Sequence, residues 1–341
     1  MNDSKRTTLK IIAEKTGVSV TTVSRVLNGQ ATRYRISKET SEKIYKCAKE
    51  LHYTPDSLAR GLRLKRTHII GLIIPDISNP FFATIAYNIE VEARKAGYSI
   101  MLCDSEENTE LEIESIKLLQ SRKVDGLLIC PVGQKSEHLE RLHNEGIPLV
   151  IVDRYFPDLP FSYVVSDNYN GAKAAVEYLI ENGHKKIACI QGLLNTRVND
   201  DRVRGYKDAH IKHGLTIDET LIVGDSFGEK NGYIGAKLIL SRSSPTAIFA
   251  ASNLIALGSL RAISEEGFKI PDDISIISFD DQPYTEYLAT PLTTIAQPHS
   301  EMGQIAVKLI IEQIESKGNF NPVKLKLPTK LIKRKSVKRL S

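Results

Sequence analysis

The sequence predicts a small all-α head with a helix-turn-helix, followed by an α/β core of two lobes, each a doubly wound parallel sheet. The first observation is the apolar spacing of three and four residues over positions 8–51, which is typical of short helices. The second is the alternation of short β-branched strands with amphipathic helices from His68 onward, which is typical of parallel sheets covered on both faces. Because this alternation runs through two consecutive series, we expect two lobes.

The first predicted helix begins after Thr8, a hydroxyl residue that we expect to cap it. Leu9, Ile12 and Ala13 then share one face of the helix. Gly17 is expected to end it, because glycine readily adopts the backbone conformation that closes a helix.

A second helix is expected only a few residues later, capped by Ser19. Val23, Val26 and Leu27 form its buried stripe. The opposite face carries Val20, Thr21, Ser24, Arg25 and Asn28. Two short helices joined by a tight turn, the second with a polar outer face, make a helix-turn-helix.

The outer face of this second helix has the chemistry of a DNA-reading surface. Val20 can contact a thymine methyl, Thr21 can bond a base edge, and the Arg25 fork can pair with guanine or with a phosphate. Small hydroxyl residues suit phosphate contacts, which fix the register. The DNA-contact candidates of the helix are Ser19, Val20, Thr21, Thr22, Ser24, Arg25 and Asn28. An ordinary helical hairpin with a solvated polar face is the alternative.

The segment GVSVTTVSRVLNG resembles the signature of the lactose-repressor (LacI/GalR) family of bacterial transcription regulators, and later segments extend the resemblance over nearly the whole chain. The resemblance implies a DNA-binding domain over residues 1–54, a hinge helix or linker over 55–67, and a two-lobed effector-binding and dimerisation core over 68–341. It also implies that the core is related to periplasmic sugar-binding proteins.

The charge distribution supports a DNA-binding head on an acidic body. Residues 1–66 hold 15 basic and 6 acidic side chains, and residues 323–341 hold 8 basic and none acidic. The middle of the chain therefore holds 23 basic and 35 acidic side chains, a net charge of −12. Because polyanion affinity comes from clustered cations, this asymmetry favours DNA binding by the head alone.

No signal peptide or membrane span is visible in the sequence, so we expect a cytoplasmic protein. The four cysteines, Cys47, Cys103, Cys130 and Cys189, are widely spaced, which favours free thiols over disulfides or a metal site. No cofactor is expected.

Two further segments connect the predicted elements, one inside the head and one between the head and the core. The basic loop at 30–36, a few residues longer than is usual in the family, precedes a third helix that Ser37 is expected to cap and that Ile44, Ala48 and Leu51 pack onto the first two. Phosphate contacts by Arg33, Tyr34 and Arg35 stay open because of this departure. In the hinge segment, the resemblance implies that Leu62 wedges into the minor groove, with Ala59 packed against the groove and Arg63 reaching its floor. A plain interdomain linker is the alternative.

The core is predicted to bind a ligand between its lobes, since ligands of open parallel sheets bind beyond the carboxyl ends of the strands. The strand at 163–167 is expected to open the second series. The expected helices are 79–96, 111–121 and 137–145 in the first series, and 171–182, 202–213, 231–240 and 255–266 in the second. The segment 291–298 then resembles a return crossing, followed by a helix that packs on the first lobe and a final strand pair in 323–336.

Several polar and aromatic side chains fall at or near these strand ends. The candidate effector-binding residues are Phe82, Asp104, Asp153, Arg202, Phe227, Ser252, Asp280 and Gln297. The resemblance implies that Arg202, expected to open a helix, and Asp280 are the principal ligand contacts. Capping of the next helix or turn is the plainer interpretation of Asp104 and Ser252. Asn253 stands where the family often has an aspartate, which removes one carboxylate.

Two other classes of function compete with a regulator. An enzyme is disfavoured because the sequence has no dinucleotide-binding glycine turn, Walker lysine, nucleophile elbow or histidine-rich metal motif. A freestanding sugar receptor is disfavoured by the head and the hinge. We therefore expect a homodimeric repressor that binds a palindromic operator and responds to a small molecule, a sugar or sugar derivative by resemblance, with a nucleobase or nucleoside as the alternative. Induction and co-repression both stay open.

Overall fold

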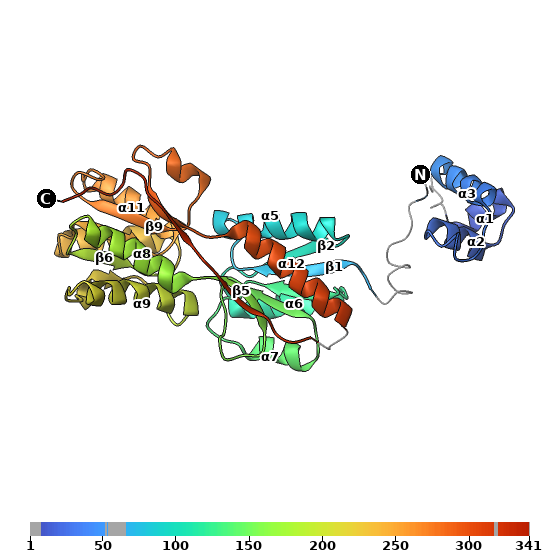
Figure 1. The fold of residues 1–341 in the computed structure, drawn as a ribbon, viewed down its shortest axis with the longest axis horizontal. Coiled ribbons are helices and arrows are strands. Elements are labelled where there is room, and N and C mark those ends of the chain that lie inside the picture. The colour runs from blue at the N-terminus through green and yellow to red at the C-terminus, as the bar shows by residue number, and fades with distance from the viewer. Residues whose placement is uncertain (1–7, 52, 54–65, 317–319, 341) are drawn as a thin grey trace, which may run out of the picture. The chain divides into compact units, whose positions relative to one another are not determined.

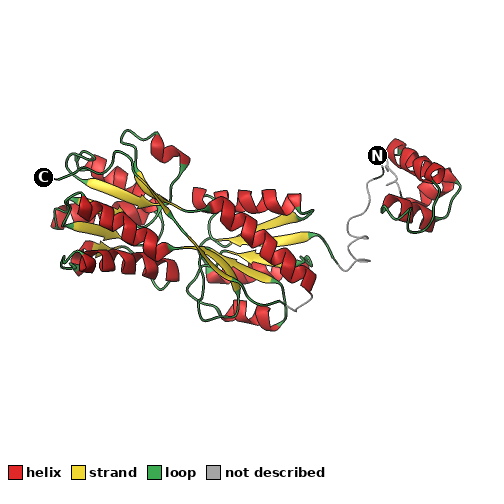
Figure 2. Cartoon of the chain, viewed as in Figure 1, coloured by secondary structure: helices red, strands yellow, loops and turns green. Residues whose placement is uncertain are grey.

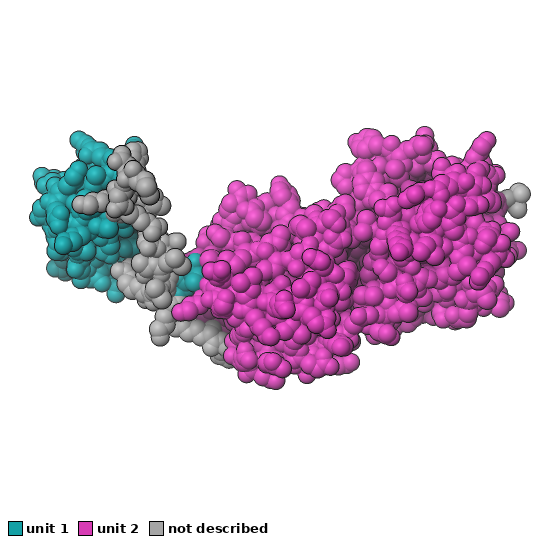
Figure 3. All heavy atoms as spheres, turned by 180° about the vertical axis from the view of Figure 1, so that it is seen from behind, with its two compact units in different colours: residues 1–67 teal, residues 68–341 magenta. Residues whose placement is uncertain are grey.

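The computed structural model describes residues 8–51, 53, 66–316 and 320–340, which form the helices and strands of Figures 1 and 2. The chain divides into two compact units, residues 1–67 and 68–341, which are coloured separately in Figure 3. The hinge candidates Ala59, Leu62 and Arg63 lie outside the described residues. The boundary between head and hinge at residue 54 therefore stays a prediction.

Among the described residues, no helix combines the length and the apolar character that crossing a bilayer requires.

The first unit is a three-helix head made of α1 (Leu9–Thr16), α2 (Val20–Leu27) and α3 (Lys38–Glu50). Its core is small: Ile12, Val23, Val26 and Ile44 are fully buried, and Ala48 closes the cluster from α3. Side chains from all three helices meet in this cluster, as the apolar spacing predicted.

The caps of the head helices follow the sequence with one exception. The Ser19 hydroxyl accepts a hydrogen bond from Thr22 N at 3.1 Å, and Ser37 does the same for Thr40 N at 3.1 Å. Gly17 ends α1 in the left-handed conformation, with φ of 70°. Thr8 is the N-cap residue of α1, as predicted, but its side chain makes no capping hydrogen bond.

The first lobe of the second unit is a six-stranded parallel sheet in the order β11-β5-β4-β3-β1-β2. Helices α5 and α12 cover one face, where they bury Ile70, Leu72 and Ile74 of β1, and α6 and α7 cover the other (Figure 2). The elements are β1 (Ile69–Ile74), α5 (Pro80–Lys95), β2 (Ser99–Asp104), α6 (Thr109–Ser121), β3 (Gly126–Ile129), α7 (Glu137–Asn144), β4 (Leu149–Val152), β5 (Ser162–Ser166), α12 (His299–Ser316) and β11 (Lys324–Leu327).

The second lobe repeats this design with the strand order β12-β10-β9-β8-β6-β7, in which β12 alone is antiparallel to its neighbour. Helices α8 and α9 pack on one face and α10 and α11 on the other. The elements are α8 (Asn168–Glu181), β6 (Ile187–Ile190), α9 (Arg197–Lys212), β7 (Ile222–Val223), α10 (Glu229–Arg242), β8 (Ala247–Ala250), α11 (Asn253–Glu265), β9 (Ser275–Phe279), β10 (Thr293–Ala296) and β12 (Lys330–Ile332), with short 3-10 turns at Glu219–Leu221 and Pro283–Glu286.

The chain crosses between the lobes after β5, after β10 and after β11, and two of these crossings correct the sequence prediction. Strand β5 pairs with β4 and β11, so it belongs to the first lobe and does not open the second. The expected final strand pair is also wrong, because β11 joins the first sheet and β12 the second. The return crossing before α12 is confirmed, since α12 lies against α5 (Figure 1).

The helix pair of the second lobe approaches closely at two glycines. A Cβ at Gly232 would lie 2.1 Å from Ile255 O, and one at Gly258 would lie 2.0 Å from Glu229 O. Both neighbours are backbone atoms, which cannot rotate away. Glycine at these positions therefore sets the spacing between α10 and α11, and α11 carries one wall of the site described next.

Candidate functional site

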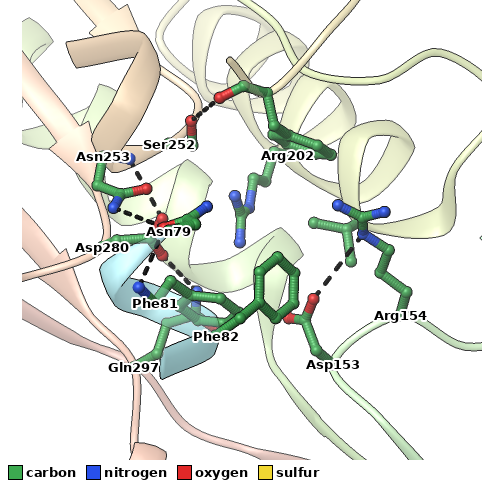
Figure 4. Close-up of a pocket in the computed structure, with 12 residues that line it drawn as sticks. Asn79, Phe81, Phe82, Asp153, Arg154, Arg202, Ser252, Asn253, Asp280 and Gln297 are labelled. Carbon is green, nitrogen blue, oxygen red and sulfur yellow. Dashed lines mark hydrogen bonds and ion pairs between the residues drawn. The ribbon is translucent and has the colours of Figure 1, made fainter. Parts of the chain in front are cut away.

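A narrow pocket lies between the two lobes, at the carboxyl ends of their strands (Figure 4). The start of α5, the turn after β4 and the segment after β10 line it from one side, and α9, the start of α11 and the turn after β9 from the other. Its lining residues are Asn79, Phe81, Phe82, Asp153, Arg154, Val198, Arg202, Phe227, Ser252, Asn253, Asp280 and Gln297.

The pocket brings together most of the residues selected from the sequence, which are Phe82, Asp153, Arg202, Phe227, Ser252, Asp280 and Gln297. Asp104 is not among the lining residues. Its carboxylate accepts hydrogen bonds from Ile77 N at 2.7 Å and Glu106 N at 2.9 Å, so it orders the turns around it. This is the plainer role that a polar residue after a strand can take.

Arg154 is the main lining residue that the sequence reasoning missed. Its guanidinium makes two hydrogen bonds to the Glu107 carboxylate, of 2.5 and 2.6 Å, and a third to Val132 O at 2.8 Å. Burial disfavours the charge, but Glu107 together with Asp153 and Cys130 outweighs it, so the Arg154 pKa is raised. The available signal was position, because Arg154 directly follows Asp153 at the end of a buried strand. Val198, Asn79, Phe81 and Asn253 complete the lining.

The two pocket aspartates share an uncommon backbone conformation. Asp153 follows β4 with φ of 67°, and Asp280 follows β9 with φ of 72°. Left-handed conformations cost free energy in residues other than glycine, and aspartate is among the types that tolerate them best. Both turns therefore hold strain at equivalent places in the two lobes, and both aim a carboxylate at the pocket (Figure 4).

Arg202 is held rigidly in the second lobe. It is buried, its Nε donates to Asn168 Oδ1 at 2.9 Å, and its Nη1 donates to Ala251 O at 2.5 Å. The guanidinium carbon lies 3.7 Å from the centre of the Phe279 ring. Burial lowers the pKa of Arg202, while Asp280 and Asp153 act against that shift. Figure 4 shows its guanidinium near the middle of the pocket residues.

The two carboxylates of the pocket differ in how many of their oxygens accept hydrogen bonds from the protein. Both Asp280 oxygens accept hydrogen bonds, from Gln297 Nε2 at 2.5 Å and Asn253 N at 3.2 Å. Asp153 Oδ1 has no partner among the described residues. Burial raises the Asp153 pKa to about 6, although Arg154 and Arg202 oppose the shift.

Three buried oxygens that line the pocket have no hydrogen-bond partner within the described part of the chain: Asp153 Oδ1, Asn253 Oδ1 and Gln297 Oε1. Buried polar atoms are normally paired, and leaving one unpaired costs about 1–3 kcal/mol. All three are acceptors. The pocket is therefore suited to a small molecule that donates several hydrogen bonds and that also packs against the rings of Phe82 and Phe227.

Direct hydrogen bonds join the lobes around the pocket. Asn253 Nδ2 of α11 donates to Asn79 Oδ1 at 3.0 Å, and the same Asn79 oxygen caps α5 by accepting from Phe81 N at 3.0 Å. Gln134 Nε2 donates to Leu194 O at 3.0 Å. The lobes are thus in direct contact, and a change in their separation must break these bonds.

The DNA-contact candidates from Ser19 to Asn28 lie on α2 and on the two residues that cap it. Ser19, Val20 and Thr21 are exposed, with Val20 at 44%, whereas Thr22, Ser24, Arg25 and Asn28 are half-buried. Two of them also have structural roles: Ser19 caps α2, and Asn28 Nδ2 donates to Ser24 O at 2.5 Å. In the described residues, no group of three or more histidine, cysteine or acidic side chains could hold a metal ion, and all four cysteines are free.

Known proteins resemble the chain along nearly its whole length. The family model "Bacterial regulatory proteins, lacI family" matches residues 8–56, and "Periplasmic binding proteins and sugar binding domain of LacI family" matches residues 67–335. The HTH-type transcriptional regulator DegA of Bacillus subtilis (strain 168) is 36% identical over 330 residues, which cover 96% of this chain and 95% of the relative.

Two further relatives extend this result. The HTH-type transcriptional repressor PurR of Histophilus somni (strain 129Pt) is 35% identical over 336 residues, which cover 98% of this chain and 99% of the relative. Among solved structures, the lac repressor dimer bound to operator and the anti-inducer ONPF matches with a TM-score of 0.87 and 26% identity, over 98% of this chain and all of that one.

Proposed function

The chain belongs to the LacI family of bacterial regulatory proteins and is a DNA-binding transcription regulator rather than an enzyme, and from this premise we propose that it is a repressor controlled by a small molecule in the interlobe pocket. The observation that carries the proposal is the set of unpaired acceptor oxygens inside that pocket. Ordered polar groups of this kind gain most from a ligand that supplies the missing donors.

A sugar or sugar derivative is the proposed ligand class. Its hydroxyl groups donate to Asp153 Oδ1, Asn253 Oδ1 and Gln297 Oε1, and its C–H faces pack on Phe82 and Phe227. Arg202 and Asp280 frame the ligand from the second lobe. A nucleobase or nucleoside, which donates N–H groups, is the alternative that the same acceptors and rings would fit.

We propose that the protein is a homodimer that binds a palindromic operator. It would do so in the cytoplasm, where the bacterial chromosome lies. The outer face of α2 reads the major groove through Val20, Thr21 and Arg25, while Ser19, Thr22, Ser24 and Asn28 contact the backbone. The lac repressor structure reported above is a dimer bound to operator DNA. Exposed apolar side chains on the first lobe, Ile77, Tyr87 and Leu102, supply surface for the dimer.

The proposed control is a shift between lobe arrangements. A ligand that bridges the lobes favours one separation, and the separation determines whether two hinge segments pair in the minor groove through Leu62, Ala59 and Arg63. Couplings of this kind are typically about 1–3 kcal/mol per site. Two sites in a dimer would then change operator affinity by about two decades.

A thermal-shift screen of the full chain against monosaccharides, disaccharides and nucleosides tests the ligand class. We expect a sugar to raise the melting temperature of the wild type. Arg202→Lys keeps the charge but loses the fork, so it should lose this response, whereas Asp104→Asn, outside the pocket, should keep it. A response to nucleosides alone would replace the sugar assignment, and an unchanged response of Arg202→Lys would contradict the role of the pocket.

A further inference from the structure

The lengthened loop between α2 and α3, residues 30–36, is an ordered part of the head. Tyr34 N donates to Gln30 O at 3.2 Å, and Ile36 N donates to Ala31 O at 2.9 Å. Ala31 and Ile36 also pack against the head core. The two anchored ends fix the loop tip, which carries Arg33, Tyr34 and Arg35.

The tip of this loop contacts the recognition helix at one residue. The guanidinium carbon of Arg25 lies 3.8 Å from the centre of the Tyr34 ring, and that of Arg33 lies 5.8 Å from it. Tyr34 is 41% exposed, so the ring covers Arg25 while remaining at the surface. Arg25 is only half-buried, and no ion pair within the described head involves it.

We propose that loop 30–36 is a second DNA-contacting element, in which Tyr34 is a positioning residue for Arg25 and Arg33 and Arg35 contact phosphates. This inference rests on the proposed DNA reading by α2. A guanidinium that meets an aromatic ring through its face keeps its N–H groups free at its edges, and those edges pair with guanine O6 and N7. The ring therefore orders the long side chain before DNA arrives, which reduces the entropy lost on binding.

The chemistry of the tip fits a phosphate backbone beside the base-reading arginine. The loop holds two arginines and no acidic residue, and Arg33 and Arg35 are exposed. Arginine suits phosphate because its donors form a planar fork. Tyr34 of the tip then serves sequence reading by positioning Arg25. Arg33 and Arg35 add affinity that does not depend on the DNA sequence.

The test uses the full-length protein and a selection from random duplex DNA at fixed salt, followed by binding to the selected site and to its single-base-pair variants. An exposed cation–π contact corresponds to about a 2–5-fold effect. Tyr34→Ala should reduce discrimination at one base pair of each half-site by this factor. Tyr34→Phe, which keeps the ring, should discriminate as the wild type does. Loss in both variants, or in neither, would overturn the positioning role.

A double-mutant cycle separates positioning from a general effect on the head. In the Arg25→Ala background, Tyr34→Ala should cause no further loss of discrimination, because the positioned side chain is gone. Additive losses would overturn the inference while leaving DNA reading by α2 intact. A protein that selects no sequence at all would overturn the proposed function and this inference with it.

The phosphate contacts have their own signature. Arg33→Ala and Arg35→Gln should each lower the slope of log affinity against log salt by about 1, equally for all sequences. Lys49→Ala is the matched control, since Lys49 lies at the far end of the 13-residue α3, about 18 Å along the helix from the loop. Unchanged slopes in both arginine variants, or the same change in the control, would overturn this part.

Discussion

At the scale of single residues, the two pocket aspartates occupy equivalent places in the two lobes but differ in their hydrogen bonds. Both follow a strand in a left-handed conformation, yet Asp280 uses both oxygens in hydrogen bonds within the protein, whereas Asp153 keeps Oδ1 unpaired in a buried place. Asp280 therefore orients neighbouring donors, and Asp153 is the carboxylate with capacity left for a ligand.

The raised pKa of Asp153 predicts a pH-dependent cost in the ligand-free protein. The folded-state pKa of about 6 exceeds the ordinary value of 3.8, so the folded protein holds a proton that the unfolded chain releases, and stability falls as the pH rises from about 4 to about 6. At pH 7, Asp153→Asn should be more stable than the wild type by about 3 kcal/mol, and the difference should shrink at pH 5. Urea unfolding at both pH values measures this, and a less stable variant at pH 7 would contradict it.

Position along the chain predicted most of the pocket but not all of it. Aspartates and a serine directly after apolar strands could be read from the sequence, because strand ends of parallel sheets meet at one edge. The same rule selected Asp104, whose oxygens the local turn instead occupies. Arg154 was not predicted as a pocket residue, because its buried charge is paired with Glu107. These residues lie 47 positions apart, so no local pattern reveals the pairing.

At the scale of elements, the sequence predicted the strands and helices better than their place in the fold. Strand β5 is buried along its whole length, as are the central strands of both sheets, so its burial pattern does not tell which sheet it joins. Helix α9 begins at Arg197, five residues before the predicted start, so Arg202 lies in its second turn and does not open it. Its first turn carries the Arg197–Asp201 ion pair, which apolar spacing does not reveal.

Close packing of α10 on α11 predicts a steric cost at Gly258. In Gly258→Ala, the new methyl would meet Glu229 O and Tyr233 N, both backbone atoms, so the helices must separate. Overpacking of this kind costs about 1–3 kcal/mol and should lower the melting temperature. Gly228→Ala is the control, because its Cβ would meet only Ser226 Oγ at 3.6 Å. Equal melting temperatures for the two variants would contradict the packing argument.

The hydrogen bond between α11 and the start of α5 predicts a change in lobe closure. Asn253→Ala removes the donor to Asn79 Oδ1, and that oxygen keeps its bond to Phe81 N. A neutral hydrogen bond contributes about 1 kcal/mol, so open forms should gain about fivefold in population. Small-angle scattering should show a larger radius of gyration in the ligand-free variant.

The matched control for this variant is Asn182→Ala, which removes a hydrogen bond of 2.7 Å from the residue that caps α8 to Tyr178 O. It should leave the radius of gyration unchanged, because both residues belong to the second lobe. An unchanged radius in Asn253→Ala as well would mean that the Asn79 bond does not govern closure.

At the scale of the whole molecule, charge separates the two tasks. The basic head has the cations that binding to a polyanion requires. The acidic body carries a pocket with unpaired hydrogen-bond acceptors. Each unit has its own core, so the ligand and the DNA act on different cores of one chain. Regulation of this kind therefore requires coupling between the two units, which a ligand in the pocket must change.

The most direct test is the affinity of the full-length protein for its selected palindromic site, measured at fixed salt with and without a saturating ligand of the pocket. We expect operator affinity to change by about two decades in the wild type and by much less in Arg202→Lys. Equal affinities with the pocket empty and filled would contradict it.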